Sequence, residues 1–198
     1  MSYHAIVIGS SAGGLHALKT IITGLDASFN IPVMIVQHMS PQSDNFMSRY
    51  LNQLSHLQIK EADEKEPIRQ KHVYIAPPNF HLLIEEDKSL SLTVDEKVNY
   101  ARPSIDVLFE SAAYAYGKNL IGIVLTGANS DGSAGLRMIQ EAGGLAIIQQ
   151  PHTAEVSIMP QAALDACPQA VLLSLEQIAP YLNRLNNDPQ SVAQPTST

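Results

Sequence analysis

The sequence contains one cysteine, Cys167, and no tryptophan. A single cysteine cannot form an internal disulfide, so the fold is not a disulfide framework, and we expect Cys167 to be a small buried residue. No apolar run approaches the length that crosses a membrane, and the N-terminus lacks the basic-then-apolar pattern of a secretion signal. These absences predict a cytoplasmic protein without direct membrane insertion.

Charge is also scarce. Charged residues make up 16% of the chain and the formal net charge is −7, while 45% of the residues are hydrophobic. An acidic chain does not carry the basic footprint of nucleic-acid binding, and it is repelled by an anionic membrane surface. The 198 residues suit one domain of ordinary size. We expect this domain to span 1–185, followed by a disordered polar tail at 186–198.

The most informative stretch is HAIVIGSSAGG at 4–14. An apolar run of strand length ends in small residues, and GSSAG at 9–13 fits the G-x-S-x-G pattern that places a serine on a strand-to-helix turn. The alternatives are a dinucleotide loop, a phosphate loop and a merely structural serine. Ser11 occupies the second glycine position of the dinucleotide pattern, and the phosphate-loop lysine is absent. Ser11 is therefore a candidate nucleophile.

Apolar runs and helical patterns alternate along the rest of the chain. A short connection at 86–89 favours a β-hairpin over a crossover. This order predicts an α/β fold with a doubly wound, mostly parallel sheet, helices on both faces and an inserted antiparallel hairpin. We expect an exposed charged segment at 61–71, helices at 15–23, 43–54, 105–116, 134–142, 159–166 and 175–185, and strands at 5–8, 31–37, 73–76, 81–84, 90–94, 120–125, 145–148 and 170–173.

Three polar residues follow strands of the predicted sheet. Ser11 follows the first strand, His38 the second, and Asp131 the apolar run at 120–125. Because ligands collect at the carboxyl ends of parallel strands, these residues could form a nucleophile, a base and an orienting acid. Each also has an ordinary alternative: a small turn residue, a strand-end histidine with backbone hydrogen bonds, and a cap of the following helix. No histidine pair has metal-ligand spacing, so we expect no metal and no organic cofactor.

The sequence resembles the catalytic domain of CheB-type protein-glutamate methylesterases. The resemblance spans 3–182 in five blocks: IGSSAGG at 8–14, QHM at 37–39, YIAP at 74–77, RPSIDVLF at 102–109 and LTGANSDG at 125–132. It implies hydrolysis of glutamate γ-methyl esters on chemoreceptor helices with release of methanol, and deamidation of glutamines in many members. It also implies nucleophile, base and acid roles for Ser11, His38 and Asp131.

Further site residues are expected from the same resemblance. The backbone N–H of Ala128 belongs to the implied oxyanion hole, and we add that of Ala12, beside the nucleophile. Arg102 is a candidate contact for the acidic receptor surface, with a structural anchor as its alternative. Better-known members have threonine at the position of Ala12 and methionine at that of Ala128, which leaves rate and substrate range open.

The resemblance does not extend to the receiver domain that precedes the catalytic domain of chemotaxis CheB proteins. Three explanations are open: a separate response-regulator protein controls the activity, the domain acts constitutively, or its substrate is not a chemoreceptor. Two other functions also compete. One is a non-catalytic binding module with the same fold, and the other is a small-molecule serine esterase.

Overall fold

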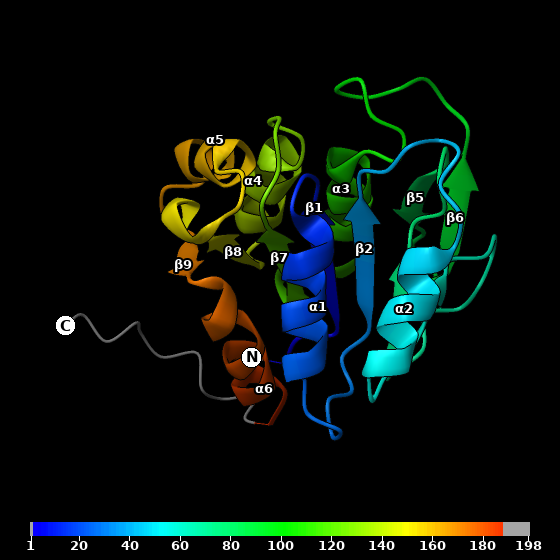
Figure 1. The fold of residues 1–198 in the computed structure, drawn as a ribbon, viewed down its shortest axis with the longest axis horizontal. Coiled ribbons are helices and arrows are strands. Elements are labelled where there is room, and N and C mark those ends of the chain that lie inside the picture. Colours follow the sequence, from blue (N-terminus) through cyan, green and yellow to red (C-terminus); the bar gives the residue numbers. More distant parts are fainter. Residues whose placement is uncertain (1, 188–198) are drawn as a thin grey trace.

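The computed structural model describes residues 2–187. Seven strands form one parallel sheet with helices on both faces, and two strands form a separate antiparallel hairpin (Figure 1). This is the predicted fold class. The strands are β1 (Ala5–Ser10), β2 (Val33–Gln37), β3 (Gln58–Glu61), β4 (His72–Ile75), β5 (His81–Ile84), β6 (Leu90–Thr93), β7 (Leu120–Val124), β8 (Leu145–Gln149) and β9 (Val171–Leu173). The helices are α1 (Gly14–Gly24), α2 (Phe46–Leu54), α3 (Ile105–Tyr116), α4 (Ser133–Glu141), α5 (Ile158–Ala166) and α6 (Leu175–Asn187), with short 3₁₀ turns at Gly117–Asn119 and Pro151–Thr153.

The order of the strands places a topological switch point beside β1. The order is β3-β4-β2-β1-β7-β8-β9, so the chain first builds outward on one side of β1 and then returns to its other side. The connections that leave β1 and β7 therefore run in opposite directions at the carboxyl edge of the sheet. Such a switch point is where ligands bind in open parallel sheets. The predicted residues 11, 38 and 131 all follow strands at this edge.

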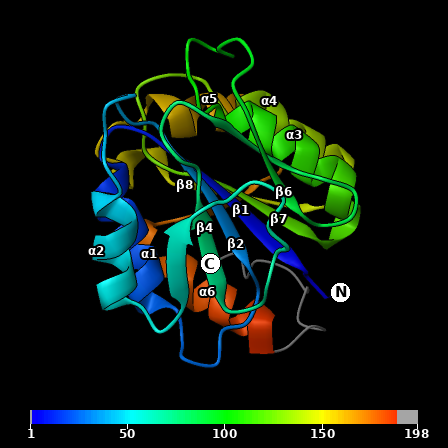
Figure 2. The same cartoon turned by 90° about the vertical axis from the view of Figure 1, so that its right-hand side faces the viewer.

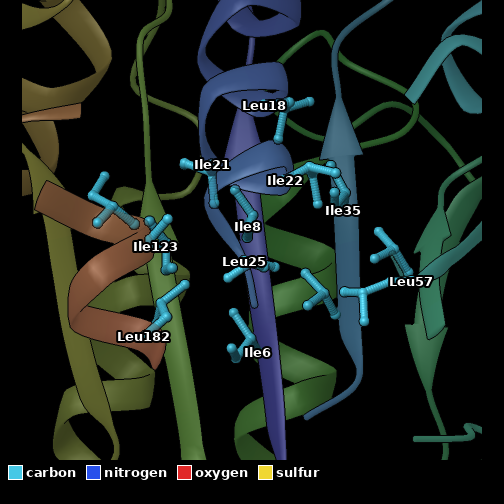
Figure 3. Packing of buried hydrophobic residues seen from close by; sticks show 14 of the residues in the cluster. Ile6, Ile8, Leu18, Ile21, Ile22, Leu25, Ile35, Leu57, Ile123 and Leu182 are labelled. Atoms are coloured by element: carbon cyan, nitrogen blue, oxygen red, sulfur yellow. The ribbon is translucent and has the colours of Figure 1, made fainter. Parts of the chain in front are cut away.

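Both faces of β1 are buried, which explains its unbroken apolar sequence. Ile6 and Ile8 point toward α1, α2 and α6, where they join one hydrophobic cluster (Figure 3). Ala5 and Val7 point to the opposite face and join the cluster under α3, α4 and α5. Each fully buried aliphatic side chain contributes about 1.5–3 kcal/mol, so the two clusters fix the central strands firmly. Cys167 is buried in the second cluster, as expected.

The bounds of most elements differ from the prediction by one to three residues, and two differences have a physical reason. β3 was not predicted, because Ile59 is its only fully buried residue and its neighbours Lys60 and Glu61 read as an exposed charged segment. It lies at the edge of the sheet, where one apolar residue is enough. The last helix continues to Asn187, since the Asn186 side chain accepts a hydrogen bond from the backbone N–H of Asn30 at 3.0 Å. The remainder of the predicted tail, 188–198, lies outside the described residues.

The loop 94–101 extends beyond the carboxyl edge of the sheet (Figures 1 and 2). Tyr100 near its end is 98% exposed. The loop connects the hairpin to α3, and an isolated pair of hydrogen bonds between Val98 and Ala101 closes its tip. No helix within residues 2–187 is both long enough and apolar enough to cross a membrane.

Candidate active site

Ser11 lies in the tight turn between β1 and α1. Its backbone N–H donates to the carbonyl of Thr126 at 2.9 Å, and its carbonyl accepts from the N–H of Gly14 at 2.9 Å. These bonds fix the Ser11 backbone between the β1 and β7 ends of the sheet. Gly13 adopts a φ of +78°, and Ser11 is not among the residues with positive φ. The strained backbone of the turn is therefore at the glycine, which tolerates it, and not at the serine.

Gln37 connects the Ser11 turn to the end of β2. Its side-chain amide donates to the carbonyls of Ser11 at 2.8 Å and His38 at 2.9 Å. Its carbonyl oxygen accepts from the buried hydroxyl of Ser10 at 2.7 Å. A Cβ atom at Gly14 would lie 1.8 Å from that same oxygen, so the turn requires a glycine there. Gln37 thus sets the spacing of the two chain segments that carry Ser11 and His38.

His38 is the neighbour of Ser11 on the adjacent strand. Ser10 pairs with Gln37 in the β1–β2 register, and the backbone N–H of His38 donates to the carbonyl of Ser10 at 3.0 Å. The His38 ring reaches the other way, and its Nε2 lies 2.8 Å from Oδ2 of Asp131. The side chain of His38 is 13% exposed and that of Asp131 is fully buried. Within residues 2–187 no hydrogen bond joins the Ser11 hydroxyl to the His38 ring, and the hydroxyl has no other hydrogen-bond partner there.

Asp131 lies in the loop just before α4, but its carboxylate binds the first turn of α3. Oδ2 accepts from the backbone N–H of Ile105 at 2.7 Å, and Oδ1 accepts from that of Asp106 at 3.1 Å. Ser104 and Asn99 donate to Oδ1 through their side chains, at 2.9 and 3.1 Å. Helix N-termini favour negative charge, so this position suits an ionised carboxylate. The cap that we considered as an ordinary role for Asp131 is therefore real, but the capped helix is α3.

These contacts determine the charge of Asp131. Burial alone raises the pKa of this carboxyl, but hydrogen bonds from the His38 ring and the backbone N–H groups outweigh burial and bring its pKa below the ordinary value. An ionised carboxylate only accepts hydrogen bonds, so Nε2 of His38 must carry the proton of the bond between them. In the neutral ring the lone pair is then on Nδ1. The arrangement can act as a base at Nδ1, with Asp131 stabilising the ring cation.

The carboxylate of Asp106 lies close to that of Asp131. Asp106 accepts from the backbone N–H of Gly135 at 2.7 Å, in the first turn of α4. The side-chain amide of Asn99 bridges the two acids, at 2.8 Å from Asp106 and 3.1 Å from Asp131. Burial and the charge of Asp131 raise the pKa of Asp106 above its ordinary value. A buried and a half-buried carboxylate are thus kept close together by the shared Asn99 donor.

The remaining predicted residues fall into two groups. Ala12 and Ala128 are exposed, and within residues 2–187 their backbone N–H groups have no recorded acceptor, so both could donate to a reacting oxygen. Arg102 is occupied inside the protein. Its guanidinium donates to Asn79 Oδ1 at 2.9 Å and to the carbonyls of Val94 and Asp95 at 2.6 and 2.9 Å. These contacts fit the alternative of a structural anchor before α3, and the receptor contact stays a prediction.

No group of three or more histidine, cysteine, aspartate and glutamate side chains among residues 2–187 is arranged to hold a metal ion.

Known proteins resemble this chain along nearly all of its length. The family model for CheB methylesterase matches residues 6–182. The chain belongs to the CheB methylesterase family. A relative from Leptospira interrogans, named as a putative protein-glutamate methylesterase/protein-glutamine glutaminase, is 53% identical over 95% of this chain and 97% of its own length.

Two further similar proteins are a longer relative and a CheB catalytic domain with a solved crystal structure. A protein-glutamate methylesterase/protein-glutamine glutaminase of Caulobacter vibrioides is 38% identical over 90% of this chain, which covers 52% of that protein. The crystal structure of the Thermotoga maritima CheB methylesterase catalytic domain is 33% identical and superposes with a TM-score of 0.88, covering 93% of this chain and all of that one. The fold of this chain is that of the CheB catalytic domain.

Sequence reasoning missed several residues that shape this CheB site. Gln37 stood within a matching block but carried no chemical signal of its own. Asp106 was interpreted only as a favourable charge for its own helix, whereas it binds the next helix. Asn99 lies 32 residues before Asp131, in a loop without periodic pattern. Only the fold brings these side chains to the acid.

Proposed function

We propose that this chain hydrolyses γ-methyl esters of glutamate side chains on methylated chemoreceptor helices and releases methanol. The observation that carries the proposal is the 2.8 Å hydrogen bond between His38 and the buried Asp131, at the strand end that adjoins the Ser11 turn. Membership of the CheB methylesterase family and the names of the relatives support the same activity.

The reaction is a two-step acyl transfer. Ser11 Oγ attacks the ester carbonyl and passes its proton to Nδ1 of His38, while Asp131 stabilises the ring cation through Nε2. His38 then returns the proton to the departing methoxide, which leaves as methanol. Water next attacks the glutamyl ester of Ser11, again with Nδ1 as the base, and frees the glutamate carboxylate and the serine.

Backbone donors complete the site. The N–H groups of Ala12 and Ala128 face solvent at the carboxyl edge of the sheet without a partner among residues 2–187, and we assign them to the oxyanion that forms at the attacked carbonyl. The same acyl-enzyme forms from a glutamine side chain when His38 protonates the departing amide nitrogen, which leaves as ammonia. Deamidation of glutamine therefore belongs to the proposal, and the second half of the relatives' names supports it.

Methanol release from methylated receptor fragments tests the proposal. The wild type should release methanol, and Ser11→Ala should release none above background, with a melting temperature within about 2 °C of the wild type because the Ser11 hydroxyl makes no recorded hydrogen bond. Ser130→Ala, in the exposed loop before Asp131, is the matched control and should be fully active. Normal turnover by Ser11→Ala would overturn the assignment.

Two readouts separate this function from its competitors. A fluorophosphonate reagent should label the wild type at Ser11, whereas a binding module of the same fold would remain unlabelled. Hydrolysis of p-nitrophenyl acetate should be slow relative to that of the methylated receptor. Equal rates on both substrates would favour a small-molecule esterase.

A further inference from the structure

Asn129 stands between the acid and the base of the site. Its Oδ1 accepts the backbone N–H of Asp131 at 3.1 Å, and its Nδ2 lies 3.4 Å from Nδ1 of His38. The first contact fixes the orientation of the amide, because only the oxygen end can accept an N–H. The amide NH₂ group is therefore directed at the ring nitrogen. Asn129 is half-buried, on the loop between β7 and α4.

The ring nitrogen that Asn129 faces is the one with the lone pair. Nε2 of His38 is committed as a donor to the ionised Asp131, so Nδ1 is an acceptor in the neutral ring. An amide donor at Nδ1 stabilises the neutral ring. Once Nδ1 carries a proton, two donors face each other and the contact becomes unfavourable. Asn129 thus distinguishes between the two protonation states of the base.

We infer that Asn129 is a positioning residue for the base: it holds neutral His38 in its resting orientation and releases Nδ1 to the Ser11 hydroxyl. The inference rests on the proposed function, because it assumes that Nδ1 takes the serine proton. The 3.4 Å separation is longer than the usual 2.9–3.0 Å of an N–H donor, so the contact is easily exchanged for the serine. The hydrogen bond from Nε2 of His38 to Asp131, on the other side of the ring, is 2.8 Å long and stays in place.

The carboxylates near the site include that of Glu155, which would lie 2.8 Å from a Cβ atom on Gly13 in the Ser11 turn. Asp131 faces Nε2 from the loop after β7, and Asp106 on α3 lies behind Asp131. The β1 side contributes the Ser11 turn. Removal of Asn129 leaves the hydrogen bonds of the Asp131 carboxylate to α3 in place, but it removes both the donor at Nδ1 and the acceptor of the Asp131 backbone N–H. Asn129→Asp can keep that acceptor, so comparing the two variants separates the two contacts.

The test compares Asn129→Ala, Asn129→Asp and the control Ser130→Ala. The rate of Ser11 phosphonylation by a fluorophosphonate is measured from pH 5 to 9. Loss of one weak donor should move the acidic limb of the Asn129→Ala profile to higher pH by about half a unit. The plateau rate at high pH should equal or exceed that of the wild type, because the serine has lost its competitor. Ser130→Ala should follow the wild-type profile.

Asn129→Asp should give a larger shift of the acidic limb in the same direction. A carboxylate at this position stabilises the protonated ring, so its acidic limb should move further to higher pH than that of Asn129→Ala. A merely structural role for Asn129 predicts a uniform loss of rate at every pH. A uniform loss, or a profile of Asn129→Ala identical to the wild type, would overturn the inference.

Histidine ¹⁵N NMR tests the role of Asn129 without a measurement of enzyme activity. At high pH the His38 Nε2 resonance should be that of a protonated nitrogen and Nδ1 that of an acceptor. In Asn129→Ala the Nδ1 resonance should shift toward that of an unbonded ring nitrogen. An unchanged Nδ1 resonance, or a proton on Nδ1, would contradict the inference. If the wild type instead gives the expected spectra but is not labelled at Ser11, the proposed function fails and Asn129 still binds the ring.

Discussion

Asp131 caps the first turn of α3, and Asp106 on α3 caps the first turn of α4. The carboxylate oxygens lie 2.7 Å from the backbone N–H groups of Ile105 and Gly135 respectively. A side chain on Gly135 would meet Cβ of Phe109 at 2.5 Å, so the two helices approach closely at this point. The position of the candidate catalytic acid is therefore set by the packing of two helices, and the same hydrogen bonds keep it ionised.

Asp131→Asn should disable the site and weaken the fold together. The amide cannot accept from Nε2 of His38 in the same way and allows the wrong ring tautomer, so kcat should fall by about 10³–10⁴-fold. An NH₂ group facing the donors of α3 should lower the free energy of unfolding by about 1–3 kcal/mol. Methanol release and urea unfolding measure the two effects. A stable variant with normal kcat would show that Asp131 is not the acid.

The stability difference between wild type and Asp131→Asn should depend on pH. The pKa of Asp131 in the folded protein lies below its ordinary value, so its ionised form stabilises the fold above the pKa of the unfolded chain. This contribution is lost as the pH falls through the folded pKa. Urea unfolding between pH 7 and pH 3 should thus show a constant gap down to about pH 4 and a shrinking gap below it. A gap that widens in acid would reverse the assigned direction.

Asn99→Ala should affect the reaction through the two carboxylates. The variant removes the donor shared by Asp131 and Asp106, and the increased repulsion should lower kcat about tenfold, which corresponds to about 1.4 kcal/mol. Because the effect acts through the acid, fluorophosphonate labelling of Ser11 should slow by a similar factor. Tyr100→Ala, an exposed neighbour on the same loop, is the matched control. Equal labelling rates of the two variants would contradict this role for Asn99.

Arg102→Lys should behave like Arg102→Ala. A lysine cannot reproduce the planar set of donors that binds Asn79 and the carbonyls of the loop, so both variants should lose about 1–2 kcal/mol of stability. Proteolysis within 94–101 should become faster in both. The receptor-contact alternative instead predicts that Lys retains function and that KM for methylated receptor rises with salt. Salt titrations of KM for the three proteins distinguish the two roles.

The helices and strands that have a local sequence pattern could be predicted from the sequence. The apolar run of β1, the small residues at 9–14 and the short connection in the hairpin predict those elements locally, and the fold class follows from their order. The strand-end rule also brought His38 and Asp131 to one edge. The rule could not predict site roles for Asn99 and Asn129, because polar side chains in loops have no periodicity, or for Asp106, whose contact is with the next helix. Their partners are backbone groups and carboxylates that only the packed helices bring near. β3 was missed for a related reason, since an edge strand with one buried residue has no alternating pattern to detect.

Gly14→Ala should be costly mainly while Gln37 is present. The backbone of Gly14 is not in the left-handed region, so alanine fits the helix start. The main obstacle is the Gln37 side chain, whose oxygen lies 1.8 Å from the new Cβ atom, and Ser10 Cβ lies 3.0 Å from it. Gly14→Ala alone should therefore cost about 1–3 kcal/mol of stability and displace the Ser11 turn. Gln37→Ala should also destabilise, because the carbonyls of Ser11 and His38 lose their donor.

The double variant separates steric overlap from a need for glycine itself. In the Gln37→Ala background the added methyl group keeps only the 3.0 Å approach to Ser10 Cβ, so Gly14→Ala should cost much less there, and the cycle should show a favourable coupling of about 1–3 kcal/mol. Urea unfolding of the four proteins gives this coupling energy. Additive costs would mean that the turn demands glycine for its backbone, and that the spacing between the Ser11 and His38 segments does not depend on the Gln37 side chain.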